Sequence, residues 1–81
     1  MIYIKDNEFI RGNCPMTKEE IRILSISKME VEENSRVLDI GAGTGSISIQ
    51  LAKICSRGNV VSIEKDEEAL RLIELNRKKF D

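Results

Sequence analysis

Histidine and tryptophan are both absent from this chain of 81 residues. Without histidine, neither histidine-based catalysis nor a histidine-ligated metal is available. The two cysteines, Cys14 and Cys55, stand far apart, and no Cys-x-x-Cys spacing occurs. This arrangement suggests neither a zinc site nor a redox-active dithiol, so we expect two reduced thiols and no bound metal.

Long apolar runs and a surplus of either charge are missing as well. No segment approaches the ~20 apolar residues of a membrane span, and the residues after Met1 do not have the pattern of a signal peptide. With 13 basic and 14 acidic residues, the net charge is −1. We therefore expect neither a membrane nor a nucleic acid as a partner, and we expect the protein in the cytoplasm.

What is present is the pattern of an α/β protein, in a chain long enough for one domain at most. Residues 1–15 lack a helical period and predict an arm laid over the body, with a strand-like start at Ile2, Tyr3 and Ile4. Residues 16–81 predict a partial α/β domain that contains one strand–helix–strand crossover of a parallel sheet. Helices are expected at about 18–29, 46–55 and 67–80, and parallel strands at 36–40 and 60–63.

Several local features make finer predictions. Thr17 and Glu20 fit a capping box for the first helix, and Asp66 fits an N-cap for the last. Gly58 suits a left-handed cap after the middle helix. The strand at 36–40 shows no clear alternation, as expected for a parallel strand that is buried on both faces. In the first helix, Ile21, Leu24 and Met29 form an apolar stripe that Ile23 and Ile26 widen, and in the last helix Ala69, Leu70, Ile73 and Phe80 share one face.

The most informative segment is a glycine-rich turn that follows the first expected strand. Asp39 ends an apolar run, and Gly41, Gly43 and Gly45 follow at alternate positions before a helix. A side chain at these glycines would block either the tight turn or the approach of a ligand, and some of them need a positive φ. The free N–H groups of the helix suit a carboxylate or phosphate, and Asp39 could accept hydrogen bonds from a ligand ammonium. The turn therefore predicts a site for a nucleotide-like ligand.

Glu64 supplies a further part of this site. It closes the second expected strand, and in a parallel crossover its carboxylate lies beside the glycine turn, where it can accept both hydroxyls of a ribose. S-adenosylmethionine fits such a site, with its amino-acid end over the turn. The spacing is Gly-x-Gly-x-Gly and not the Gly-x-Gly-x-x-Gly of dinucleotide binders. A nicotinamide or flavin site and a purely structural turn remain as alternatives.

Three segments of the chain, 8–12, 15–22 and 39–49, resemble the cobalt-precorrin-6B C15-methyltransferase (decarboxylating) family of cobalamin biosynthesis. The same enzyme forms one half of precorrin-6Y methylase. The most specific segment is Pro-Met-Thr-Lys-Glu-Glu-Ile-Arg, since many class I methyltransferases share the glycine turn. The resemblance implies the N-terminal part of a Rossmann-like class I methyltransferase fold, S-adenosylmethionine as cofactor, a tetrapyrrole substrate and a homo-oligomer.

The resemblance also implies roles for residues in the matching segments. Thr17 would lie beside the cofactor, Gly41 to Gly45 would wrap its amino-acid end, and Glu64 would hold the ribose. The candidate cofactor-binding residues are Thr17, Asp39, Gly41, Ala42, Gly43, Thr44, Gly45 and Glu64. No catalytic residue can be named.

Much of the family fold has no counterpart among these residues. The strand with the adenine-binding turn, and the strand with the loop near the substrate, would both follow Asp81. We therefore expect the chain by itself to be inactive. Two other functions stay open: a non-enzymatic binding or assembly module that keeps the turn, and a fragment of an NAD-dependent dehydrogenase, against which Asp39 argues.

Overall fold

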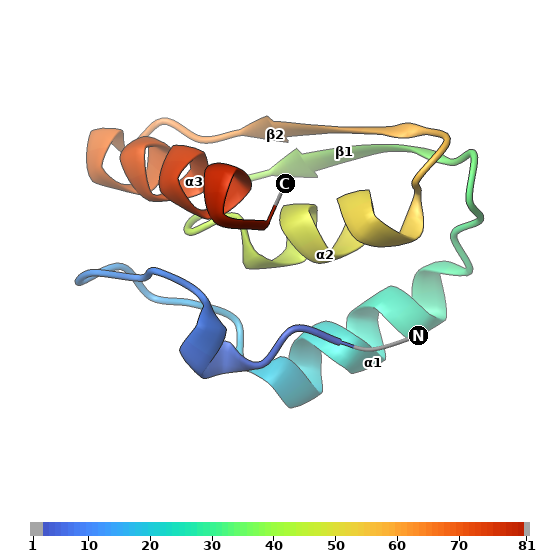
Figure 1. The fold of residues 1–81 in the computed structure, drawn as a ribbon, viewed down its shortest axis with the longest axis horizontal. Helices are drawn as coiled ribbons and strands as arrows, with labels where there is room; N and C mark the ends of the chain where they lie inside the picture. The colour runs from blue at the N-terminus through green and yellow to red at the C-terminus, as the bar shows by residue number, and fades with distance from the viewer. Residues whose placement is uncertain (1–2, 81) are drawn as a thin grey trace.

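The computed structural model describes residues 3–80, which form a two-stranded parallel sheet and the helices that cover it (Figure 1). The elements in chain order are η1 (Asp6–Glu8), α1 (Glu19–Met29), β1 (Arg36–Ile40), α2 (Ser46–Ile54), β2 (Asn59–Ile63) and α3 (Glu67–Phe80). The expected order of helices and strands is confirmed, and the ends differ from the prediction by a single residue at most.

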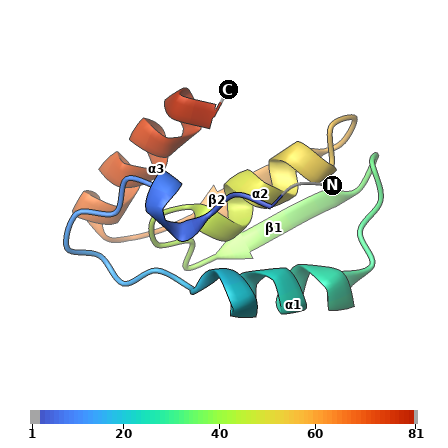
Figure 2. The same ribbon diagram turned by 60° about the horizontal axis from the view of Figure 1, so that its bottom comes forward.

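The strands β1 and β2 pair in parallel, in a register that places Asp39 opposite Ser62. In Figure 1 the helix α2 lies below the sheet and α1 lies below α2, so the helices are on one side of the sheet. The turned view in Figure 2 shows α2 between α1 and α3, and α2 contacts both. On the other side, Leu38 and Ile40 are 57% and 74% exposed. The prediction that β1 is buried on both faces is thus wrong within residues 3–80, because every helix described there packs on the same face.

The N-terminal arm contributes directly to the core. Ile4 and Phe9 form a buried cluster with Ile49 of α2, and the ring of Phe9 lies 5.2 Å from that of Phe80. The backbone N–H of Ile4 donates to the side chain of Gln50 at 2.7 Å instead of joining a strand. The expected strand-like start is therefore absent at Tyr3 and Ile4, and Ile2 lies outside the described residues.

The start of α1 differs from the predicted capping box. Lys18 occupies the N-cap position and its side chain makes no capping hydrogen bond. The carboxylate of Asp6, from the arm, accepts the N–H of Glu19 at 3.1 Å and takes the place expected for the Thr17 hydroxyl. Thr17 instead offers its carbonyl oxygen to the guanidinium of Arg22 at 2.8 Å.

The buried face of α1 is also different from the expected apolar stripe. Of the expected stripe, Ile26 is buried as predicted, but Ile21, Leu24 and Met29 are exposed. Arg22, which is not part of the stripe, is fully buried. The arm explains why Arg22 can be buried, because the carbonyls of Ile4 and Thr17 and the carboxylate of Asp6 bind the two terminal nitrogens of its guanidinium, which burial would otherwise penalise.

Two smaller predictions about the C-terminal half have opposite outcomes. Asp66 is confirmed as the cap of α3, since its carboxylate accepts the N–H of Ala69 at 2.9 Å. Gly58 does not have a positive φ. A Cβ on Gly58 would lie 1.9 Å from the carbonyl oxygen of Ser35, so glycine is required by the close approach of two backbone segments.

The inward face of α3 is formed by Ala69, Leu72 and Asn76, and Leu70 is 44% exposed instead of buried. Within residues 3–80, no helix combines the length and the apolar character that crossing a membrane requires.

Candidate functional site

The glycine turn connects the end of β1 directly to the start of α2. Gly41, Gly43 and Gly45 have φ values of 77°, 60° and 83°, a conformation that other residues rarely adopt, as the sequence predicts for at least some of them. The N–H groups of Gly41 and Ala42 both donate to the carbonyl oxygen of Ile63, at 2.7 and 3.2 Å. The turn is therefore tied to the end of β2, and α2 begins immediately after Gly45.

A cavity of about 110 Å3 opens at this turn. It is lined by Pro15, Met16, Thr17, Asp39, Gly41, Ala42, Gly43, Thr44, Ser46 and Ile47. The structure thus brings Thr17, from the segment before α1, together with Asp39 and the turn. A cavity of this size accommodates a small polar group, such as the amino-acid end of a larger ligand, and not a complete nucleoside.

Thr44 adds a polar group that has no partner within the protein. Its residue is 1% exposed, and its hydroxyl oxygen makes no hydrogen bond to any of the residues described. Buried hydroxyl groups are normally satisfied, so an exception beside a cavity calls for an explanation. The first N–H groups of α2, at Ser46 and Ile47, lie at the same place and are unpaired by the geometry of a helix. Together these donors suit a carboxylate.

Asp39 is held from one side by two serines. The hydroxyl of Ser48 donates to Oδ2 of Asp39 at 2.6 Å, and the hydroxyl of Ser62 donates to that of Ser48, also at 2.6 Å. No partner for Oδ1 of Asp39 occurs among residues 3–80. This oxygen is the acceptor that Asp39 retains for a ligand at the cavity.

Glu64 reaches the turn from the end of β2. Its Oε1 accepts the N–H of Gly43 at 2.8 Å, and its Oε2 accepts the N–H groups of Lys65 and Asp66 at 3.1 and 3.0 Å. The hydrogen bonds from Asp66 and Gly43 hold the pKa of the Glu64 carboxyl below its ordinary value. Three backbone N–H groups thus use three of the roughly four acceptor sites of the carboxylate, and Oε1 keeps a site for a further hydrogen bond. The carboxylate is therefore charged, fixed and adjacent to the turn.

Two buried polar side chains hold the walls of the cavity together. Asn76 of α3 donates to the carbonyl oxygens of Ile10 and Thr44, at 2.7 and 3.1 Å, and accepts the N–H of Ile10 at 2.7 Å. Arg22 binds the carbonyl of Thr17 on the opposite wall. The position of the arm against the turn thus depends on side chains that belong to α1 and α3.

Several residues of the site are not apparent from the sequence motifs. Met16, Ser46 and Ile47 line the cavity, and Ser48 and Ser62 contact Asp39 directly or through one hydroxyl. Strand position offers a signal for Ser62, because Asp39 and Ser62 are each the penultimate residue of their strands. No comparable sequence signal identifies Asn76 or Arg22.

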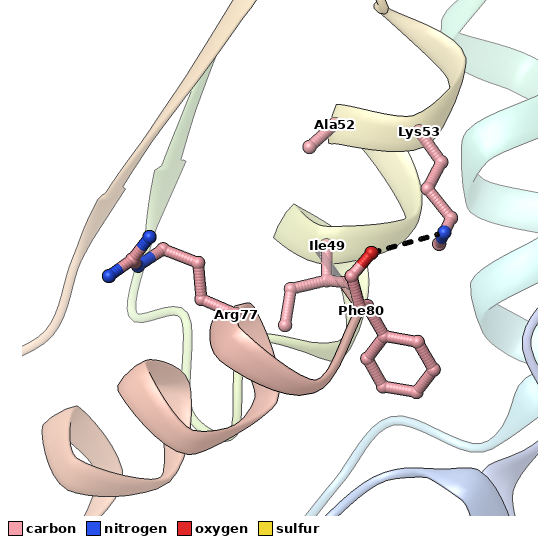
Figure 3. A pocket seen from close by; sticks show the side chains of 5 residues that line it. All are labelled: Ile49, Ala52, Lys53, Arg77 and Phe80. Carbon is pink, nitrogen blue, oxygen red and sulfur yellow. Dashed lines mark hydrogen bonds between the residues drawn. The ribbon is translucent and has the colours of Figure 1, made fainter.

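A second cavity of about 110 Å3 lies between α2 and α3 (Figure 3). It is lined by Ile49, Ala52, Lys53, Arg77 and Phe80. Lys53 donates to the carbonyl oxygen of Phe80 at 3.4 Å, and in the close-up Arg77 points away from both. Neither an acid nor a nucleophile lines this cavity, and Lys53 binds the backbone at the end of α3. We therefore assign this cavity no catalytic role.

The part of the chain that the structure describes contains no cluster of metal ligands, and its Cys14 thiol is not activated. Between Tyr3 and Phe80, no three or more cysteine, aspartate and glutamate side chains come together to hold a metal ion. Partial desolvation and the neighbouring carboxylates, Glu68 first among them, raise the pKa of the Cys14 thiol, which keeps it in the unreactive protonated form.

The fold and the turn together define a Rossmann-like α/β domain of the class I methyltransferase type. Residues 8–81 match the family described as precorrin methyltransferase domain, and the chain belongs to this family. The resemblance found in the sequence is thereby confirmed, and so is the predicted fold class.

Named relatives and solved structures agree with this assignment. The chain is 47% identical over 78 residues to the cobalt-precorrin-6B C(15)-methyltransferase (decarboxylating) of Salmonella typhimurium, covering 95% of this chain and 41% of that protein. It is 44% identical over 79 residues to the probable enzyme of the same name from Sulfurisphaera tokodaii, with the same coverage. The chain thus spans about two fifths of the length of these relatives.

Among solved structures, precorrin-6y C5,15-methyltransferase from Geobacter metallireducens matches with a TM-score of 0.91 and 34% identity, over 98% of this chain and 42% of that one. The C-terminal domain of precorrin-6Y C5,15-methyltransferase from Rhodobacter capsulatus matches with a TM-score of 0.80 over 95% of this chain and 40% of that one. At 23% identity, the second match supports the fold alone.

Proposed function

We propose that this chain is the S-adenosylmethionine-binding part of a cobalt-precorrin-6B C15-methyltransferase (decarboxylating) that acts in cobalamin biosynthesis. The observation that carries the proposal is the convergence of Thr17, Asp39 and the glycine turn on one cavity, with Glu64 bonded to the same turn. The names of the relatives support a precorrin, a tetrapyrrole, as the substrate of the whole protein.

In this proposal the two charged groups of the amino-acid end are bound by different partners. Its carboxylate accepts hydrogen bonds from the N–H groups at the start of α2 and from the hydroxyl of Thr44. Its ammonium donates to Oδ1 of Asp39. Glu64 offers its remaining acceptor site, on Oε1, to the ribose while it stays bonded to Gly43. When bound, S-adenosylmethionine supplies the methyl group. The residues named here orient it, and Thr17 borders the space beside it.

Competitive calorimetry tests this function. We expect S-adenosylhomocysteine to bind the purified protein more tightly than NAD, since a cavity built of an acid, helix N–H groups and a hydroxyl matches an amino acid and not a pyrophosphate. NAD binding more tightly would contradict the proposal and favour a dehydrogenase. Binding of neither ligand would favour a module that keeps the turn for structural reasons.

A further inference from the structure

Asp39, Ser48 and Ser62 form a relay of hydrogen bonds that joins β1, α2 and β2. Ser62 stands directly opposite Asp39 in the sheet, and Ser48 lies above the pair on α2. Both hydrogen bonds are 2.6 Å long, at the short end of the range for O–H···O contacts. Ser48 is only 5% exposed, so its hydroxyl has little access to water as an alternative partner.

The direction of the protons in this relay follows from the chemistry of its end. An ionised carboxylate can only accept, so Ser48 must donate to Asp39 and is left to accept from Ser62. Each hydroxyl has one proton, and each proton therefore points toward Asp39. The two hydrogen bonds strengthen each other, since a hydroxyl that accepts a hydrogen bond becomes a better donor.

We propose that Ser48 and Ser62 are positioning residues that fix the carboxylate of Asp39 for the ammonium group of an α-amino acid moiety. Without Ser48, no side chain among residues 3–80 would hold Oδ2 of Asp39, and the carboxylate would be free to rotate about its Cβ–Cγ bond. With Ser48 bound to Oδ2, the rotation is blocked and Oδ1 stays at the cavity. This inference rests on the proposed function, because it assigns the ligand end that Asp39 recognises.

A merely structural role for the two serines would have a different consequence. If the hydroxyls served only to satisfy buried polar atoms, their removal would weaken the binding of every ligand to the same degree. A positioning role affects only ligands that carry the ammonium group. The two roles are separated by comparing S-adenosylhomocysteine with 5′-methylthioadenosine, which has the nucleoside but lacks the amino-acid end.

The test uses Ser48→Ala and Ser62→Ala, with Ser25→Ala on the exposed face of α1 as the matched control. Alanine is a good helix former, so Ser48→Ala should keep α2 intact, and thermal melting checks this. We expect Ser48→Ala to weaken S-adenosylhomocysteine binding roughly ten-fold and to leave 5′-methylthioadenosine unchanged. Ser62→Ala should weaken S-adenosylhomocysteine binding by a smaller factor, and Ser25→Ala should change the affinity for neither ligand. Ser48→Thr, which keeps a hydroxyl, should bind S-adenosylhomocysteine as tightly as the unmodified protein.

Equal weakening of both ligands, or no effect of Ser48→Ala on S-adenosylhomocysteine, would overturn the positioning role. If the unmodified protein binds neither ligand, the proposed function fails instead, and the relay is judged by the 13C resonance of the Asp39 carboxyl group without ligand. That resonance should move in Ser48→Ala and in Ser62→Ala, but not in Ser25→Ala. An unmoved resonance in Ser48→Ala would refute the relay itself.

Discussion

The carboxylate of Glu64 accepts the backbone N–H of Gly43 at 2.8 Å, so the end of β2 is bonded to the turn that follows β1. The two residues are 21 positions apart in the chain, and only the parallel pairing of the strands brings them together. This bond makes the glycine turn and the acid at the next strand a single unit.

Glu64→Gln should therefore weaken the binding of S-adenosylhomocysteine roughly ten- to a hundred-fold, because glutamine keeps the shape but provides a single uncharged acceptor. Glu67→Gln, in the exposed first turn of α3, is the matched control and should leave affinity unchanged. Calorimetry on both variants measures the effect. An affinity equal to that of the unmodified protein in Glu64→Gln would show that Glu64 is only an acid at a strand end.

The lowered pKa of Glu64 predicts a pH dependence of stability. Because the folded-state pKa lies below the ordinary value of 4.5, the charged form stabilises the fold at pH values above 4.5. This contribution is lost as the pH falls through the folded-state pKa. Urea unfolding from pH 7 to 3 should show a difference between the unmodified protein and Glu64→Gln that is constant near neutrality and shrinks under acid conditions.

Asp6 and Glu74 also have lowered pKa values, so the unmodified protein and Glu64→Gln will both lose stability in acid. Only the difference between the two proteins reports on Glu64. A difference that does not change with pH would mean that the backbone hydrogen bonds seen at its carboxylate do not favour the charged form.

Gly58→Ala should destabilise the fold more than Gly41→Ala. The added methyl group at Gly58 would lie 1.9 Å from the carbonyl oxygen of Ser35, and two backbone segments must separate to admit it. A Cβ added at Gly41 would have no atom within 4 Å apart from its chain neighbours, so only the positive φ opposes alanine, at a cost of about 1–2 kcal/mol. Chemical denaturation of both variants measures the order, and a milder effect at Gly58 would contradict the close approach.

The chain by itself should neither methylate nor decarboxylate a precorrin. It spans about two fifths of the relatives that are named for this reaction, and its described residues contain two strands of the sheet. Incubation of the purified 81-residue chain with cofactor and precorrin substrate tests this. Measurable turnover would mean that these residues, or a second copy of them, complete a catalytic site.

The 81-residue chain should also associate with itself in solution. Leu38 and Ile40 of β1 and Val61 and Ile63 of β2 form an exposed apolar face, and within residues 3–80 the outer edge of β1 has no strand partner. Such edges and patches favour pairing. Light scattering should show an oligomer, and Ile40→Lys should shift it toward the monomer. A soluble monomer at high concentration would refute the prediction.

Ile21→Lys, on the exposed face of α1, serves as the comparison for that variant. If Ile21→Lys dissociates the oligomer and Ile40→Lys does not, the contact is made through α1 instead of the sheet.

The glycine turn and the order of elements could be predicted from sequence because both depend on neighbouring residues. Positive φ at Gly41, Gly43 and Gly45, the cap at Asp66 and the apolar run of β1 are local properties. The same local reasoning was wrong for Thr17 as a cap and for the apolar stripe of α1, where a distant segment takes part.

The sequence by itself thus determined the class of fold and the presence of an acid, a glycine turn and a second acid at the ends of two strands. The tertiary structure decided which groups surround them: the arm at the core, Arg22 and Asn76 buried between segments, and two serines behind Asp39. The physical reason is that a buried polar side chain needs partners, and those partners come from parts of the chain that sequence neighbours do not reveal.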